Sequence, residues 1–198
     1  MEKLLGLFAE TEIFIFVFME IITRMKTFQR VVVKKADWRD KAIFIVVFGG
    51  FSIFGTYVGI PLPSGAIVNI RDFAPMIAGL TSGPIIGLAV GLIGGIHRFF
   101  LGGFTCIPCG VSTVLAGLIC GAIHYFNKGK LIGILQGVLL AVLVELLHGG
   151  VTLLIARPLA AALEVVKIAI PAMMIANALG VAIAIIIIEH TKELRESA

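Results

Sequence analysis

The sequence predicts an all-α, polytopic transmembrane helical bundle, with five full spans plus a Gly-rich helix hairpin and six or seven membrane helices in total. Hydrophobic residues make up 59% of the 198 residues and charged residues only 14%. The mean hydropathy is +1.09, whereas water-soluble domains contain roughly 45–50% apolar residues. The apolar residues also form continuous runs of about the 20 residues that a helix needs to cross a bilayer.

The first apolar stretch, Leu4–Thr23, is interrupted by Glu10, Glu12 and Glu20. A charge at the middle of a membrane helix costs about 2.5–3.5 kcal/mol on insertion scales. We still interpret this stretch as a membrane helix, and an amphipathic helix at the membrane surface is the alternative. It lacks the basic start and small-residue cleavage site of a signal peptide, so we expect it in the mature protein.

A basic segment follows, because seven of the 16 Lys and Arg residues lie between Arg24 and Lys41. Positively charged loops stay in the cytoplasm, so this loop is expected inside the cell and the N-terminus outside. A nucleic-acid partner is disfavoured because hydrophobic segments flank the loop on both sides. The three cysteines, an odd number, argue against a disulfide framework.

The five strongest membrane segments begin near Ala42, Phe73, Phe99, Leu131 and Ile168. The only acidic or histidine side chains in the run Leu131–Ala156 are Glu145 and His148, and the other four runs carry no Asp, Glu, Lys or Arg. Breaks rich in Pro, Gly or polar residues separate the segments, at Pro61–Gly65, Gly102–Gly103, Asn127–Lys130 and Arg157–Pro158. Glu164 and Lys167 are interpreted as loop charges before the last span.

Thr81-Ser-Gly-Pro84 interrupts the second segment. Proline disfavours helix in the residue before it, so two short helices, about 70–82 and 84–98, are predicted to fold back as a hairpin. A single kinked span is the alternative, since membrane helices tolerate proline. Only the hairpin puts Arg71 and Arg98 on the same outer side and the C-terminus inside. Gly87, Gly91 and Gly95 form a ridge on which another helix can pack closely.

Arg71 and Arg98 flank this hairpin. Arginine within a membrane must reach the headgroups, pair with an acid or bind something. Either side chain could contact headgroups, and Asp72 could neutralise Arg71. Two guanidinium groups at one mouth of a bundle would instead form a forked donor site that matches a carboxylate. A small carboxylate ligand would then offset the cost of burying them.

Cys109 and Ser112 fall at the start of the next helix, three residues apart and on one face. Pro108 suits its first turn. Helix N-termini attract anions, so this thiol and hydroxyl could contact a second oxygen of the same ligand. Ordinary buried packing is the main alternative. A redox pair of Cys106 with Cys109, or a metal site that adds His97, fits the pattern less well, and we expect no metal, cofactor or catalytic residue.

Glu145 and His148 lie one helical turn apart within a span and could form a buried pair or a proton relay. We favour pairing, or a position near a helix end, over a role in transport. Asn177, which follows Pro171, is expected to hydrogen-bond a neighbouring helix.

Several motifs resemble the five-transmembrane receptor module of the LytS/YhcK type. They are Asn69-x-Arg71-x3-Pro75-x2-Ala78-Gly79-Leu80-x2-Gly83-Pro84, Gly94-Gly95-x-His97-Arg98, Gly102-Gly-Phe-Thr105-x3-Cys109-Gly-x-Ser112-Thr113, and Asn177-x2-Gly180. The resemblance covers about residues 41–190. That module lies at the N-terminus of bacterial sensor histidine kinases and of some diguanylate cyclases. It is distantly similar to the substrate-binding S-components of energy-coupling-factor transporters, a likeness that favours the hairpin.

The resemblance implies a plasma-membrane sensor of extracellular pyruvate or a related carboxylate, with Arg71, Arg98, Cys109 and Ser112 as ligand-binding residues. A transporter's substrate-binding component is the alternative. We expect an N-terminal helix and basic loop (residues 1–40), a ligand-sensing domain (41–190) and a cytoplasmic tail (191–198). No kinase or cyclase domain fits in the chain. The expected partners are therefore membrane lipid and a cytoplasmic kinase or cyclase, and a homodimer is left open.

Overall fold

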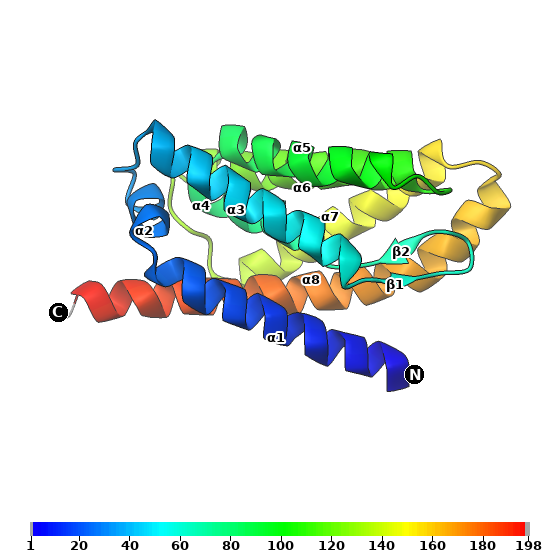
Figure 1. The fold of residues 1–198 in the computed structure, drawn as a ribbon, viewed down its shortest axis with the longest axis horizontal. Coiled ribbons are helices and arrows are strands. Elements are labelled where there is room, and N and C mark those ends of the chain that lie inside the picture. Colours follow the sequence, from blue (N-terminus) through cyan, green and yellow to red (C-terminus); the bar gives the residue numbers. More distant parts are fainter. Residues whose placement is uncertain (1, 197–198) are drawn as a thin grey trace.

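The computed structural model describes residues 2–196, and its architecture is all-α, as predicted (Figure 1). Within that range there are eight helices and one pair of two-residue strands. In chain order they are α1 (Glu2–Arg24), α2 (Lys26–Val32), α3 (Trp38–Tyr57), β1 (Ile60–Pro61), β2 (Ile67–Val68), α4 (Phe73–Ser82), α5 (Pro84–Phe100), α6 (Cys106–Phe126), α7 (Ile134–Ile155) and α8 (Leu159–Glu196).

Four helices of the described range, α3, α6, α7 and α8, are long and apolar enough to cross a membrane, and α4 and α5 are shorter apolar helices. Large apolar side chains cover the outside of the bundle: Ile85, Leu135 and Leu154 are each at least 72% exposed. Such a surface suits lipid rather than water. The prediction of a polytopic membrane bundle is therefore confirmed.

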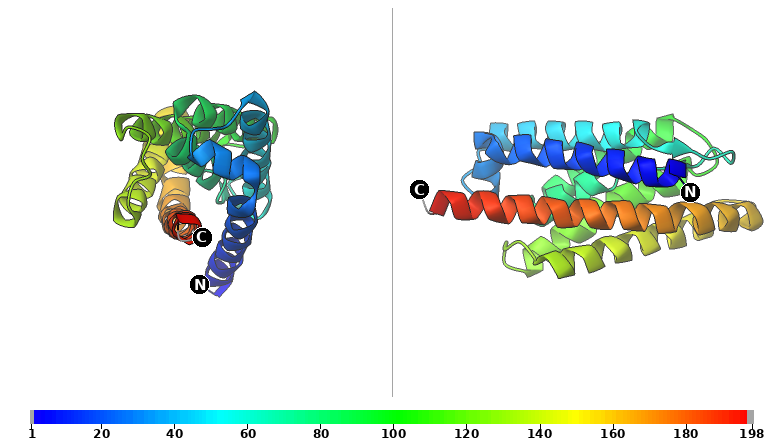
Figure 2. Two further views of the ribbon diagram at one scale, coloured as in Figure 1. Left: turned by 90° about the vertical axis from the view of Figure 1, so that its left-hand side faces the viewer. Right: turned by 90° about the horizontal axis from the view of Figure 1, so that it is seen from below.

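The first helix, α1, lies alongside α8, as the second view in Figure 2 shows. Its Ile15 and Met19 are fully buried, while Ile13 and Phe16 are exposed. Gly180 of α8 lets the two helices approach, because a Cβ at this position would lie 2.5 Å from the Ile15 side chain. The helix thus belongs to the bundle.

The helices α4 and α5 form the predicted hairpin, and the kinked single span is wrong. Gly83 separates them with φ of 90°, a value that a residue with a side chain rarely adopts, and Pro84 begins α5. A Cβ on Gly87 would lie 2.8 Å from the Cα of Gly79 and would overlap the carbonyl oxygen of Gly117 in α6. The glycine ridge therefore packs α5 against both α4 and α6, and Arg71 and Arg98 come to the same end of the bundle.

Several helix boundaries in the structure differ from the predicted ones. The basic segment contains α2, and α3 begins at Trp38 rather than near Ala42, because Asp37 and Asp40 form a reciprocal cap at its start. The third of the five strongest segments begins at Cys106 and not near Phe99, which belongs to α5. The break at Pro61–Gly65 is the turn of the antiparallel pair β1–β2.

The last span also starts earlier than predicted, at Leu159 instead of near Ile168. Glu164 and Lys167 are therefore not loop charges but lie on exposed turns of α8, 3.7 Å apart. Pro171 lies inside this helix. The helix α8 runs the full length of the bundle and ends beside α2, so the basic segment and the C-terminal end of the helix lie together (Figure 1).

A second apolar cluster covers the opposite end. Ala66 and Val68 of the β1–β2 segment pack against Val165, Ala169 and Met173 in the first half of α8, and Phe104 joins them. This cluster lies at the end of the bundle to which the hairpin brings its two arginines.

Candidate anion-binding site

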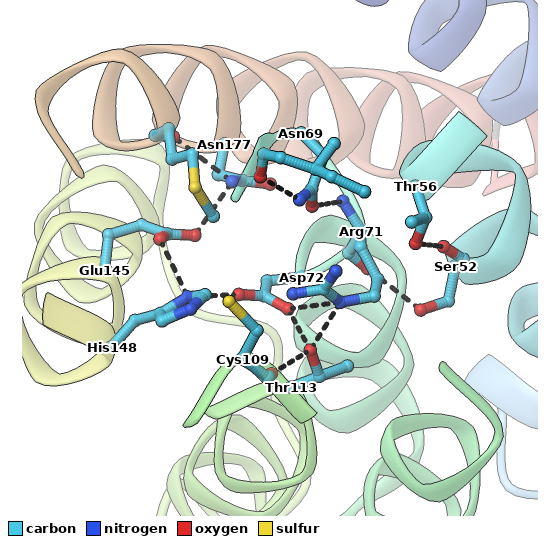
Figure 3. A network of polar contacts seen from close by, with 12 residues as sticks. Ser52, Thr56, Asn69, Arg71, Asp72, Cys109, Thr113, Glu145, His148 and Asn177 are labelled. Carbon is cyan, nitrogen blue, oxygen red and sulfur yellow. Dashed lines mark hydrogen bonds and ion pairs between the residues drawn. The ribbon is translucent and has the colours of Figure 1, made fainter. Parts of the chain in front are cut away.

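The backbone of Arg71 is held in place by two hydrogen bonds and by close packing against α3. Its N–H donates to Asn69 Oδ1 at 3.0 Å, and its carbonyl accepts from Ser52 Oγ of α3 at 3.0 Å. A Cβ on Gly55 would lie 3.0 Å from the Arg71 nitrogen, so α3 packs directly against this backbone. The side chain is therefore attached to a well-held backbone, and it points into the bundle (Figure 3).

The Arg71 guanidinium is completely buried, yet only partly satisfied. Its Nε donates to Thr113 Oγ1 of α6 at 2.7 Å and lies 3.6 Å from Asp72 Oδ1. Its two terminal nitrogens, Nη1 and Nη2, have no hydrogen-bond partner among the described residues. Buried polar groups are nearly always paired, so two unpaired cationic donors indicate a place for an acceptor that the protein does not supply.

Arg98, at the end of α5, is only 1% exposed. Its Nη1 donates to the Gly102 carbonyl at 2.6 Å and its Nη2 to Thr105 Oγ1 at 3.2 Å, so the guanidinium holds the loop before α6. Its Nε has no partner within the described chain. Arg98 is thus a second buried positive charge at this end of the bundle, which favours an anion beside it.

The start of α6 brings the remaining predicted residues to this place. Cys109 and Ser112 are both buried, and the Ser112 hydroxyl is another buried group without a partner in the described structure. The Thr113 hydroxyl donates to Asp72 Oδ1 at 2.6 Å. The Cys109 side chain lies in the same group of buried side chains as Asp72 and Arg71 (Figure 3).

A chain of buried polar groups leads from Arg71 to α7 and α8 (Figure 3). His148 Nδ1 lies 2.9 Å from Asp72 Oδ2 and 3.5 Å from Glu145 Oε2. Asn177 of α8 donates to Glu145 Oε1 at 2.8 Å. The pairing of Glu145 with His148 and the interhelical hydrogen bond of Asn177 are both as predicted.

The three groups Asp72, Glu145 and His148 lie within 4.8 Å of one another, a spacing that a metal ion could bridge. Both Asp72 oxygens are already hydrogen-bonded, and a guanidinium lies beside one of them. We therefore interpret Asp72, His148 and Glu145, together with Asn177, as a network of hydrogen bonds and ion pairs, which is called the relay below. The other suggested metal set, Cys106 and Cys109 with His97, does not form such a group in the part of the chain that is described; His97 instead contacts Tyr57. All three cysteines are free.

The sequence pattern does not identify Thr105 and Thr113 as site residues. Thr105 and Thr113 connect the arginines to α6, and the signal available was their position one turn before and one turn after Cys109. The sequence predicts Asp72 only as a partner of Arg71, yet it also binds His148. Nothing in the spacing of Asp72 and His148 along the chain indicates this contact.

A comparison with protein families identifies the chain. A family model described as 5TMR of 5TMR-LYT matches residues 25–191, which include the hairpin, both arginines and the relay. This chain belongs to the 5TMR-LYT family. Its members are five-transmembrane receptor modules of the LytS type, so the chain is a multi-pass membrane receptor module.

Curated relatives of the 5TMR-LYT module are sensor proteins. The chain is 33% identical over 196 residues to sensor protein LytS of Bacillus subtilis (strain 168), which covers 90% of the chain and 33% of the relative. It is 32% identical over 148 residues to sensor histidine kinase BtsS of Escherichia coli (strain K12), covering 72% of the chain and 26% of the relative. The chain thus spans a third or less of these proteins' length. No solved structure matches it.

Proposed function

We propose that this receptor module binds pyruvate or a similar short carboxylate between Arg71, Arg98, Cys109 and Ser112, and passes its occupancy to a cytoplasmic output domain or partner. The observation that carries the proposal is the pair of unpaired Arg71 nitrogens in a fully buried guanidinium. Two parallel N–H donors match the two oxygens of one carboxylate. Hydrogen bonds to charged groups contribute about 1.5–3 kcal/mol each, enough to favour the bound state.

The neighbouring donors fit the rest of such a ligand. The unpaired Nε of Arg98 adds a second positive charge, and the free Ser112 hydroxyl can donate to a keto or hydroxyl oxygen beside the carboxylate. Asp72 limits this attraction, because it lies 3.6 Å from Arg71 Nε. It contacts the Nε edge of the guanidinium and leaves the terminal nitrogens available.

The proposed orientation follows from charge. The basic segment lies at the end of the bundle opposite Arg71 and Arg98, so the positive-inside rule puts the site toward the outside. The end of α8 then lies in the cytoplasm. Since Asn177 of α8 binds the relay that begins at Arg71, this helix is the element through which a change at the site can reach an output domain.

Isothermal titration calorimetry on the detergent-solubilised protein tests the proposal. We expect saturable binding of pyruvate and none of methyl pyruvate, whose ester removes the negative charge. Arg71→Lys keeps a positive charge but loses the planar fork, so its affinity should fall at least tenfold. Arg39→Ala, which removes an exposed arginine of α3 far from the site, should bind as the wild type does.

Equal affinity of the wild type and Arg71→Lys would reject the carboxylate clamp. Uptake of labelled pyruvate into proteoliposomes separates a sensor from the transport alternative. A sensor binds the ligand but accumulates none inside the vesicles, whereas accumulation above protein-free vesicles would favour a transport component.

A further inference from the structure

The site holds a buried acid–imidazole pair that carboxylate binding alone does not require. Glu145 is fully buried and His148 is 2% exposed, both on α7 and both away from lipid. The Oε2 atom of Glu145 and the Oδ1 atom of Asn177 have no hydrogen-bond partner among the described residues. An unpaired carboxylate oxygen 3.5 Å from an imidazole nitrogen is a place where a proton can be held.

The charges around this pair can be counted. Two buried cations, Arg71 and Arg98, face two buried acids, Asp72 and Glu145. At a pH where His148 is neutral and Glu145 is ionised, the empty site carries no net charge. A bound carboxylate then leaves one uncompensated negative charge inside the bundle, and an isolated buried charge is strongly unfavourable.

Among the described residues, no element packed against the pair brings a further compensating charge to it. Asp72 faces it from the segment before α4, together with Arg71, and the charges of both are already included in the net charge given above. From α6 the Cys109 thiol faces His148, but a proton passed from this thiol to the imidazole leaves the net charge unchanged. From α8 the facing polar side chain is Asn177, which does not titrate.

We propose that the Glu145–His148 pair takes up one proton each time the site binds a carboxylate, so that the ligand is sensed together with a proton. This inference rests on the proposed function. Short carboxylates stay ionised near neutral pH, so the proton must come from solvent. The affinity for pyruvate should then fall as the pH rises, by up to tenfold per pH unit where the empty site is deprotonated and the filled site is protonated.

Calorimetry in buffers with different ionisation enthalpies measures this proton directly. The slope of the observed binding enthalpy against the buffer's ionisation enthalpy gives the protons taken up, and we expect about one per pyruvate. Glu145→Gln is the decisive variant, because it removes one negative charge and leaves the empty site with a spare positive charge. It should bind pyruvate with little or no proton uptake and lose the fall in affinity at high pH.

Glu164→Gln on the exposed face of α8 is the matched control and should keep the uptake of the wild type. Pyruvate binding without proton uptake in the wild type, or undiminished uptake in Glu145→Gln, would overturn the coupling while leaving the proposed function intact. Failure of the wild type to bind pyruvate or any short carboxylate would overturn both.

Discussion

His148 of α7 and Asp72, 76 positions earlier in the chain, lie with Nδ1 and Oδ2 2.9 Å apart. Since an ionised carboxylate only accepts hydrogen bonds, this contact places a proton on His148 Nδ1. Asp72 also accepts from Thr113 and lies beside Arg71, so this single carboxylate ties α6 and α7 to the start of the hairpin. If ligand binding moves the Arg71 side chain, the contacts of Asp72 should therefore change the position of His148 on α7 and, through Glu145, that of Asn177 on α8.

Asp72→Asn tests the structural side of this contact. The change keeps the volume but leaves Arg71 without its buried counter-charge, so we expect the free energy of unfolding to fall by about 3–5 kcal/mol. Denaturation in detergent micelles, followed by helical circular dichroism, measures the loss. Glu164→Gln breaks an exposed pair and should change stability little. Comparable losses in the two variants would contradict the claim that Asp72 stabilises the fold as the buried counter-charge of Arg71.

Gly117→Ala tests the packing of the hairpin on α6. A Cβ at Gly117 would overlap the carbonyl oxygen of Gly87 and lie 3.1 Å from the Pro75 side chain. We expect a loss of about 1–3 kcal/mol in the free energy of unfolding, because the helices must move apart. Gly50→Ala is the control: apart from the adjacent backbone of its own helix, nothing lies within 4 Å of a Cβ placed there, and the change should stabilise α3 by about 0.4–1 kcal/mol. The same sign for both substitutions would show that the close approach is not needed.

Thiol labelling tests whether the ligand reaches Cys109. Cys106 is half-buried, while Cys109 and Cys120 are buried. Saturating pyruvate should slow alkylation of Cys109 by N-ethylmaleimide several-fold, as measured by mass spectrometry of the peptides. Cys106 should react at the same rate with or without pyruvate, and Cys120, in the core of α6, should stay unlabelled in the folded protein. An unchanged rate at Cys109 would remove it from the proposed site.

The orientation in the membrane can be tested with single cysteines at Ser64 and Lys128, both exposed, in a variant that lacks the three native cysteines. We expect a membrane-impermeant maleimide added to intact cells to label the cysteine at position 64 and to reach position 128 only after permeabilisation. Labelling in the reverse order would put the arginines on the cytoplasmic side and reject an extracellular ligand.

Local signals in the sequence were sufficient for the hairpin. Pro84 and Gly83 act on their own backbone, and the glycine spacing acts along one helix, so both can be read from neighbouring residues. The end positions of Arg71 and Arg98 follow once the chain turns back at Gly83. The common face of Cys109 and Ser112 on α6 is also a local signal, because it follows from their spacing of three residues.

Other features depend on distant parts of the chain. The Asp72–His148 contact joins segments whose facing surfaces no local pattern specifies. The predicted start of α8 is wrong because charges such as Glu164 and Lys167 suggest a loop, although a helix can continue past the apolar core with its charges exposed. The strands β1 and β2 have two residues each, too few to produce an alternating pattern.

A structure of the protein determined with bound pyruvate tests the central claim most directly. The account predicts that the ligand's carboxylate oxygens lie about 2.7–2.9 Å from Nη1 and Nη2 of Arg71, with Arg98 and Ser112 in contact with the same molecule. Pyruvate bound elsewhere in the bundle, with both Arg71 nitrogens still unpaired, would contradict it.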